Sequence, residues 1–169
     1  MTLRRPRLVA AVTTGADETR KLAAEVATLA EAGDIFLLAG EMGTGKTVFV
    51  QGFARGLGVV DPVTSPTFTL VRPYAGKHLE LLHADVYRLD HLSEVVDLGL
   101  VEQLDGRAVA CIEWGDMAEP ALPADFLKIQ LDHGAEDDHR TLAMSPVGTR
   151  WQARFDALSR AVAPWAPQR

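Results

Sequence analysis

One stretch, GEMGTGKT from Gly40 to Thr47, constrains the fold of this chain more than any other. It matches the pattern G-x-x-x-x-G-K-[ST]. It follows a compact apolar run, residues 35–39, and precedes a segment with Phe49, Phe53 and Leu57 at four-residue intervals. Strand, glycine-rich loop and helix, in that order, are the context in which this pattern forms a phosphate-binding loop. The sequence therefore predicts a nucleotide-binding protein, in preference to a glycine-rich turn that carries an exposed lysine.

The residue types of this stretch suit phosphate chemistry. Glycines let successive backbone N–H groups point at phosphate oxygens, and the N-terminus of the next helix adds partial positive charge. The Lys46 ammonium can reach the β- and γ-phosphates, and the Thr47 hydroxyl can bind Mg²⁺. The predicted nucleotide contacts form one continuous segment: Glu41, Met42, Gly43, Thr44, Gly45, Lys46, Thr47 and Val48.

Two further segments with strand character end in carboxylates. A leucine-rich segment ends at Asp85, and the apolar run 108–112 leads directly to Glu113. Phosphate-loop enzymes hold Mg²⁺ with the loop hydroxyl and a carboxylate at a strand tip, because a hard cation prefers oxygen ligands. We expect Glu113 near the metal and Asp85 as a second carboxylate that binds metal or orients water. With Lys46 they form the predicted catalytic set. The alternative for each acid alone is an exposed strand end, and His83 is expected simply to pack.

Other candidates are less tightly specified. Ser65, Pro66 and Thr67 lie in a loop rich in proline and hydroxyl groups, after the predicted helix. In a nucleotide-binding protein such a loop is a candidate switch that senses the γ-phosphate, whereas a plain connector is the alternative. Thr14 is a candidate adenine contact, and Trp114 either covers the nucleotide or packs in the core.

The remaining pattern predicts an α/β protein with a three-layer P-loop NTPase fold. We expect a mostly parallel central sheet with added antiparallel strands and with helices on both faces. Residues 126–131 and 140–144 are successive strand candidates without a helix between them, which predicts an antiparallel hairpin. Helices are expected after a cap at Asp17, after a cap at Ser93, and from Trp151 to Val162. One domain is expected over residues 1–163, with a disordered tail over residues 164–169.

Composition narrows the expected location and partners. Seventeen basic and twenty-three acidic side chains give a net charge of −6, which offers no general grip on a nucleic-acid backbone. Any RNA is therefore expected to be held by a partner. A single cysteine, Cys111, suits a reducing compartment. No apolar stretch approaches the ~20 residues that a membrane span requires. A cytoplasmic protein without membrane contact is expected.

Four sequence blocks together resemble the bacterial TsaE (YjeE) family, the small ATPases of tRNA threonylcarbamoyladenosine biosynthesis. In chain order they are GEMGTGKT from Gly40, TSPTFTL from Thr64, HADVYRL from His83 and IEW from Ile112. The resemblance extends over about residues 17–123. Departures are small: Glu41 replaces the usual aspartate, and Val48 replaces a frequent second threonine. Neither position supplies an obligatory ligand.

The resemblance implies ATP and Mg²⁺ as cofactors and weak ATP hydrolysis by the protein alone. It also implies a partner, the TsaB–TsaD complex, which transfers threonylcarbamoyl to the adenosine at position 37 of tRNA. ATP hydrolysis to ADP would reset that complex between turnovers, and tRNA would be contacted only indirectly. By matching positions, Thr47 and Glu113 would bind Mg²⁺ and Asp85 would act through water. Arg88 and Trp114 match the family pattern without an assigned role.

Two other classes of protein stay open. A small-molecule or nucleotide kinase shares the loop and the fold, but no arginine-rich lid follows the third strand, since Arg72 and Arg88 are isolated. A binding module would use its nucleotide state only to gate association with a partner. No arginine finger is visible in the sequence. We therefore expect a partner to complete the site and the isolated protein to hydrolyse ATP slowly.

Overall fold

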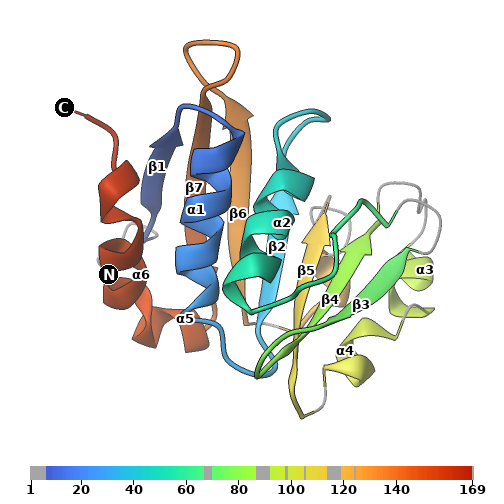
Figure 1. Cartoon of the computed structure of the whole chain (residues 1–169). Coiled ribbons are helices and arrows are strands. Elements are labelled where there is room, and N and C mark those ends of the chain that lie inside the picture. Colours follow the sequence, from blue (N-terminus) through green and yellow to red (C-terminus); the bar gives the residue numbers. More distant parts are fainter. Residues whose placement is uncertain are drawn as a thin grey trace.

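The computed structural model describes residues 7–66, 70–86, 92–97, 99–104, 106–113, 119–123 and 125–168. It contains a seven-stranded sheet with helices packed against it (Figure 1). The strands are β1 (Val9–Thr13), β2 (Ile35–Ala39), β3 (Val71–Ala75), β4 (Glu80–Asp85), β5 (Ala108–Glu113), β6 (Phe126–His133) and β7 (Arg140–Val147). The helices are α1 (Ala16–Ala27), α2 (Lys46–Gly56), α3 (Leu92–Asp97), α4 (Leu100–Gln103), α5 (Arg150–Ala153) and α6 (Phe155–Val162), with short 3₁₀ helices η1 (Glu119–Ala121) and η2 (Ala163–Trp165).

The sheet is mixed, with the order β1-β7-β6-β2-β5-β4-β3. Its four middle strands, β6, β2, β5 and β4, are parallel to one another. The outer strands pair antiparallel: β7 with β6, β1 with β7, and β3 with β4. The α/β class, the parallel centre and the antiparallel hairpin of β6 and β7 are therefore as the sequence predicted.

Burial of the middle strands explains their composition. Every residue of β2 and of β5 is buried, as expected of parallel strands that are covered on both faces. Because side chains alternate along a strand, β2 contributes to two separate apolar clusters. Phe36 and Leu38 pack with α1, α2 and the C-terminal helices. Ile35 and Leu37 pack on the opposite face with α4 and the segment around η1.

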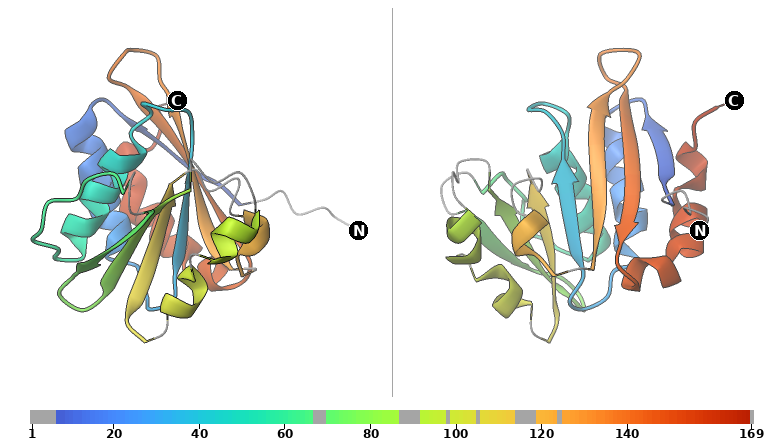
Figure 2. Two further views of the ribbon diagram at one scale, coloured as in Figure 1. Left: turned by 90° about the vertical axis from the view of Figure 1, so that its right-hand side faces the viewer. Right: turned by 180° about the vertical axis from the view of Figure 1, so that it is seen from behind.

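Helices cover the two faces of the sheet unequally. Helices α1, α2, α5 and α6 lie on one face, whereas the short α3, α4 and η1 lie on the other (Figure 2). The second apolar cluster draws on β2, β4 and β5 and only on the first residue of β6, Phe126. Within the described chain, the prediction of helices on both faces is therefore confirmed for the middle strands of the sheet. In the described part of the chain, no helix is long and apolar enough to cross a membrane.

Several helix ends differ from the sequence prediction. Gly15, in an extended conformation, is the N-cap of α1, and Asp17 lies in the first turn, where its carboxylate accepts a 2.9 Å hydrogen bond from Arg20. Ser93 lies inside α3 and does not precede it. The predicted C-terminal helix is two helices, because the backbone at Arg154 departs from helical geometry (φ −103°, ψ 8°).

The stretch predicted as a disordered tail from Pro164 begins within a short helix, and disorder over residues 164–169 stays a prediction. Residues 163–165 form η2, and Trp165 is half-buried against the larger apolar cluster. An aromatic side chain removes a large apolar area from water when it packs, which favours an ordered end.

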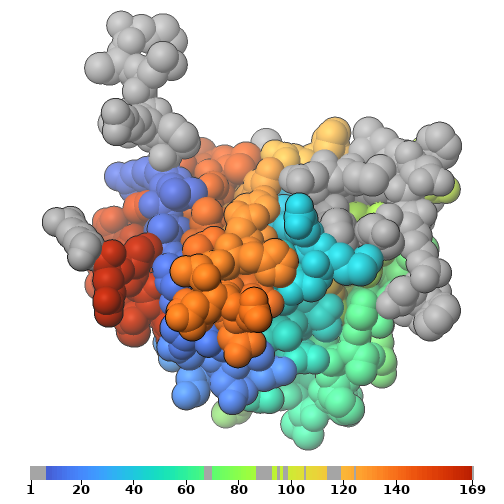
Figure 3. Space-filling model, turned by 90° about the horizontal axis from the view of Figure 1, so that it is seen from above, coloured from blue at the N-terminus to red at the C-terminus, as the bar shows by residue number. Residues whose placement is uncertain are grey.

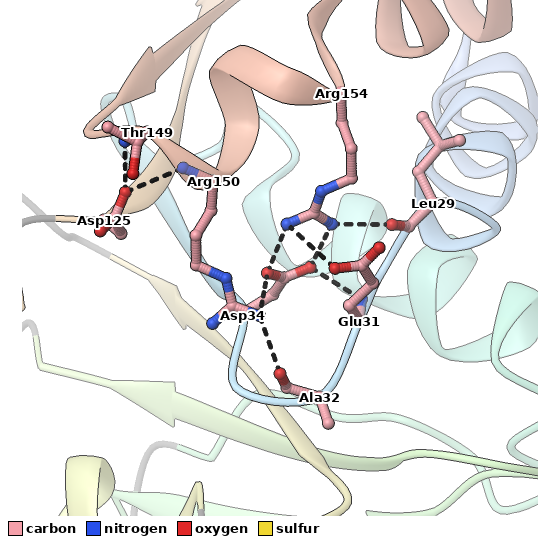
Figure 4. A network of polar contacts seen from close by, with 8 residues as sticks. All are labelled: Leu29, Glu31, Ala32, Asp34, Asp125, Thr149, Arg150 and Arg154. Carbon is pink, nitrogen blue, oxygen red and sulfur yellow. Dashed lines mark hydrogen bonds and ion pairs between the residues drawn. The ribbon is translucent and has the colours of Figure 1, made fainter.

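A buried ion pair ties the C-terminal helices to the start of β2 (Figure 4). Asp34, whose side chain is 1% exposed, accepts hydrogen bonds of 2.6 and 2.7 Å from the two terminal nitrogens of Arg154. Arg154 also donates to the Leu29 carbonyl at 2.8 Å and lies 3.9 Å above the Trp151 ring. Asp34 further accepts the Glu31 backbone N–H at 2.7 Å. At this break between α5 and α6, the two terminal nitrogens of Arg154 both have hydrogen-bond partners in the network.

A second contact extends this network to the hairpin. Arg150 donates to the Ala32 carbonyl at 2.9 Å and lies 3.4 Å from Asp34. Asp125, just before β6, accepts the backbone N–H groups of Thr149 and Arg150 at 2.5 and 3.0 Å. These hydrogen bonds lower the pKa of Asp125 and satisfy N–H groups at the start of α5.

We predict that Arg154→Ala lowers the free energy of unfolding by about 3–5 kcal/mol, because removal of one partner leaves a buried, unpaired carboxylate. Urea denaturation at constant pH measures the change. Arg160→Ala is the control, since Arg160 is an exposed residue of α6, the helix that begins directly after Arg154; its effect should stay within about 0.5 kcal/mol. Equal effects of the two substitutions would contradict a stabilising role for the network.

Candidate functional site

The glycine-rich loop connects the end of β2 to the start of α2, at the carboxyl ends of the parallel strands (Figure 1). Gly40 opens the loop with φ +145°, and Gly45, with φ +97°, is the N-cap of α2. A Cβ atom at position 40 would lie 2.3 Å from the Leu131 carbonyl oxygen and 2.8 Å from the Thr44 hydroxyl. The loop thus lies against β6 so closely that only glycine fits at its first position.

Lys46 is held inside the loop. Its Nζ donates to the carbonyl oxygens of Gly40 and Glu41, at 2.7 and 2.9 Å, and the residue is 4% exposed. Burial lowers the pKa of Lys46, whereas the charges of Glu113 and Asp85 favour the ammonium form and oppose this shift. The ammonium group of Lys46 is therefore held by two backbone carbonyls of its own loop, and two carboxylates favour its charged form.

The strand-end carboxylates meet the first turn of α2. Strands β4 and β5 pair in parallel, and Asp85 lies opposite Glu113. The two carboxylates that the sequence assigned to strand ends are therefore neighbours. The Thr47 hydroxyl donates to Glu113 Oε1 at 2.9 Å and lies 3.2 Å from Oε2. Glu113 is 3% exposed. On its other side, Glu113 Oε2 is hydrogen-bonded to Nε2 of His83, a contact that the sequence did not indicate.

The predicted switch loop lies beside Asp85. The Ser65 hydroxyl donates to Asp85 Oδ2 at 3.5 Å, and Pro66 is buried. The preceding residue, Thr64, is fixed by Arg72, whose guanidinium donates to its hydroxyl at 3.2 Å, and by Tyr74, whose hydroxyl accepts its N–H at 3.4 Å. The loop therefore reaches the carboxylate that was expected to orient water. Its response to a γ-phosphate stays a prediction.

The other residues of the predicted site differ in their exposure to solvent, and some lie outside the described part of the chain. Glu41, Met42 and Gly43 form the exposed tip of the loop, Thr44 is buried beneath it, and Val48 is half-buried in α2. The tip is open to a ligand, as a nucleotide contact requires. Thr67, Arg88 and Trp114 lie outside the described residues.

Thr14 and Cys111 have surroundings that bear on their predicted roles. The backbone N–H and the hydroxyl of Thr14 both donate to the Glu18 carboxylate, and these bonds lower the pKa of Glu18. An adenine contact from Thr14 stays a prediction. Cys111 is fully buried, and burial raises the pKa of its thiol well above the usual value, so it is no candidate nucleophile.

Arg140 is a site residue that sequence reasoning missed. From the start of β7, its guanidinium donates to the carbonyl oxygens of Thr44 and Gly43, at 3.2 and 3.3 Å. It also donates to the carbonyls of Asp137 and His139, at 2.6 and 2.8 Å, in the turn between β6 and β7. Seen from above, this hairpin lies beside the loop that follows β2 (Figure 3). One side chain thus joins the hairpin to the outer side of the glycine-rich loop.

The donor set fits a magnesium ion that is bound together with phosphate. Mg²⁺ usually takes one or two carboxylates, with phosphate oxygens and water as its other ligands. Within the described ranges no cluster of three His, Cys, Asp or Glu side chains could hold a metal alone. Thr47 and Glu113 supply a hydroxyl and a carboxylate at one point beside the loop, with Asp85 on the neighbouring strand. These are hard oxygen donors placed where phosphates would lie.

These features define an α/β protein with a glycine-rich loop, a buried lysine and two carboxylates at the carboxyl ends of its parallel strands. The family model described as "Threonylcarbamoyl adenosine biosynthesis protein TsaE" matches residues 13–142. The chain belongs to the TsaE family.

Individual relatives agree with this membership. The "tRNA threonylcarbamoyladenosine biosynthesis protein TsaE" of Bacillus subtilis (strain 168) is 41% identical over 148 residues, which cover 88% of this chain and 92% of the relative. The protein of the same description from Treponema pallidum (strain Nichols) is 42% identical over 120 residues, 71% of this chain and 88% of the relative. The crystal structure of Bacillus subtilis YdiB superposes with a TM-score of 0.79 at 35% identity, covering 93% of this chain and 97% of YdiB.

We predict that Arg140→Ala weakens the binding of ADP about tenfold, because two carbonyls of the loop lose a charged donor and the loop loses its outer support. Titration with a fluorescent ADP analogue measures the dissociation constant. Arg107→Ala is the control, since Arg107 is exposed at the opposite end of the sheet, just before β5. Unchanged ADP affinity in a folded Arg140→Ala protein would show that the loop keeps its shape without this contact.

Proposed function

We propose that this protein is a Mg²⁺-dependent P-loop ATPase that works in the threonylcarbamoyladenosine modification of tRNA at position 37. Its partner would be a transferase complex of the TsaB–TsaD type. The observation that carries the proposal is the convergence of Lys46, Thr47 and Glu113 at the mouth of the glycine-rich loop. Family membership supports the pathway, because the relatives' descriptions name threonylcarbamoyladenosine biosynthesis.

Phosphate binding follows from the loop. Its exposed tip and the N-terminus of α2 present backbone N–H groups and partial positive charge to an anion. Lys46 adds a full positive charge that is already fixed in place by two carbonyls. Because the ammonium is ordered before a ligand arrives, little side-chain entropy is lost on binding. ATP and ADP are the proposed ligands.

Hydrolysis requires charge compensation and an oriented water. Thr47 and Glu113 would hold Mg²⁺, and the ion would supply positive charge that stabilises the negative charge developing on the phosphate oxygens. Asp85 lies opposite Glu113 on the adjacent strand and is 9% exposed, so it can accept a hydrogen bond from a water near the γ-phosphate. Ser65 contacts Asp85, which gives the switch loop a route to this water.

The site also explains why hydrolysis by the protein alone should be slow. Within the part of the chain that the structure describes, the arginine that contacts the loop is Arg140, which donates to four backbone carbonyls and so supports the loop from outside. It is therefore not placed as an arginine finger, a group that contributes about 10³–10⁵ to the rate in other phosphoryl-transfer enzymes. A group from the partner would complete the site and couple hydrolysis to the transferase cycle.

We predict that Lys46→Ala lowers the affinity for ATP about 10- to 100-fold, because charge-assisted hydrogen bonds to phosphate are lost. Glu113→Ala should retain ATP binding in the absence of metal but lose the gain that Mg²⁺ confers. Fluorescent-nucleotide titrations with and without Mg²⁺ separate the two effects. Lys77→Ala, an exposed lysine in the turn between β3 and β4, is the control for loss of charge. Wild-type affinity in Lys46→Ala would overturn the nucleotide site.

We predict that the isolated protein hydrolyses ATP well below ~10 s⁻¹, a typical enzyme rate, and that a reconstituted TsaB–TsaD complex accelerates it at least tenfold. Lys46→Ala should abolish the stimulated rate. In Glu113→Ala the modification cycle should stall with the partner bound, whereas a protein that only gates association would keep its partner function. If the complex neither stimulates ATP hydrolysis nor associates with the protein, the partner assignment is overturned and a kinase is favoured instead.

A further inference from the structure

His83 is a buried histidine that joins the proposed metal site. It lies in β4, two residues before Asp85, and has no solvent exposure. Its Nε2 is hydrogen-bonded to Glu113 Oε2 on the neighbouring strand. Its other ring nitrogen, Nδ1, is buried and has no hydrogen-bond partner among the described residues. One nitrogen is therefore used at the site, and the other is left unsatisfied.

This arrangement is poorly explained by packing alone. Side chains at alternate positions of β4 and β5 face α2, and the buried neighbours of His83 on that face include Leu81 and Val109, which are apolar. A leucine at position 83 would pack among them without leaving a buried acceptor unpaired, an arrangement that is normally unfavourable. The imidazole must therefore contribute something that a hydrocarbon cannot, and the polar contact that its ring makes among the described residues is with Glu113.

The contact fixes one carboxylate oxygen. An ionised carboxylate only accepts hydrogen bonds, so the Nε2–H group of His83 is the donor to Glu113. With Oε2 held by His83, Oε1 is the oxygen nearer to the Thr47 hydroxyl, at 2.9 Å against 3.2 Å for Oε2. Before a cation binds, Oε2 of Glu113 is thus hydrogen-bonded to His83, whereas Oε1 is the oxygen nearer to Thr47.

We infer that His83 is a positioning residue that keeps Glu113 a one-oxygen ligand and thereby makes the site select Mg²⁺ over the larger Ca²⁺. Mg²⁺ demands near-octahedral geometry with ligands at about 2.0–2.1 Å, whereas Ca²⁺ accepts bidentate carboxylates at about 2.3–2.6 Å. A carboxylate that cannot turn both oxygens toward the cation suits the smaller ion. The inference rests on the proposed Mg²⁺–nucleotide site and assigns the cation preference of that site to a residue that does not touch the metal.

The test compares three substitutions at this position. His83→Leu removes the donor and keeps the apolar packing. In His83→Gln the side-chain amide nitrogen can reach the position of Nε2, whereas in His83→Asn the shorter side chain reaches only the position of Nδ1. Binding of a fluorescent ADP analogue is titrated with MgCl₂ and, separately, with CaCl₂. The ratio of the two apparent cation affinities is the readout, and it is measured without any hydrolysis.

The expected result is a change in this ratio, not only in affinity. Residues that orient a metal ligand contribute about 10- to 100-fold to metal affinity. His83→Leu and His83→Asn should therefore lose Mg²⁺ affinity about tenfold while Ca²⁺ affinity falls less, and His83→Gln should keep the wild-type ratio. Leu81→Val is the matched control for lost packing, because Leu81 is fully buried on the same strand and faces the same side. It should leave the ratio unchanged.

Other outcomes would overturn the inference in distinguishable ways. Equal loss of Mg²⁺ and Ca²⁺ affinity in all three variants would mean that His83 only supports the fold. An unchanged ratio of Mg²⁺ to Ca²⁺ affinity in His83→Leu would show that His83 has no role in cation selection. If His83→Leu does not fold, equal affinity ratios in His83→Gln and His83→Asn would show the same. Nucleotide binding by the wild type that is independent of both cations would overturn the proposed metal site itself.

Discussion

Parallel pairing at the centre of the sheet determines where polar chemistry can lie in this protein. Strands β2 and β5 are buried on both faces along their whole length, so a charged side chain within them would be strongly destabilising. Charged groups are instead found at the ends of these strands, where the backbone leaves the sheet: Asp34 directly precedes β2, and Glu113 is the last residue of β5. Asp85 and Glu113 lie at two such ends in register, and Lys46 follows a third. The site is therefore a product of the same burial that stabilises the fold.

The glycine-rich loop is supported from three directions by parts of the chain that are distant in sequence. Below the loop, the Leu131 carbonyl lies so close to Gly40 that no side chain fits there. Inside the loop, Lys46 binds two carbonyls of the first turn. Outside it, Arg140 binds the carbonyls of Gly43 and Thr44. The antiparallel hairpin is thus part of the proposed nucleotide site, although its own sequence carries no phosphate-binding pattern.

Local chemistry was predictable from the sequence, whereas contacts across the fold were not. The loop, the strand-end carboxylates and the hairpin follow from residue types at short spacing, and the structure has the loop, carboxylates and hairpin in those places. The bond from His83 to Glu113 depends on the register of two strands thirty residues apart. The contacts of Arg140 depend on how a hairpin folds back onto a loop ninety-six residues earlier. No periodicity within a segment carries that information. The predicted C-terminal helix is divided at Arg154, whose side chain pairs with Asp34 from the other end of the chain's sequence, 120 residues earlier.

The separation of Asp34 from Arg154 bears on how the chain is made. These partners are 120 residues apart in the sequence. During synthesis, β2 and its neighbours emerge from the ribosome long before the guanidinium that neutralises the carboxylate beside them. Burial of Asp34 without that partner is unfavourable, so this end of the sheet is expected to close only after Arg154 has been synthesised. Docking of the C-terminal helices onto the start of β2 is therefore expected to follow formation of the central strands.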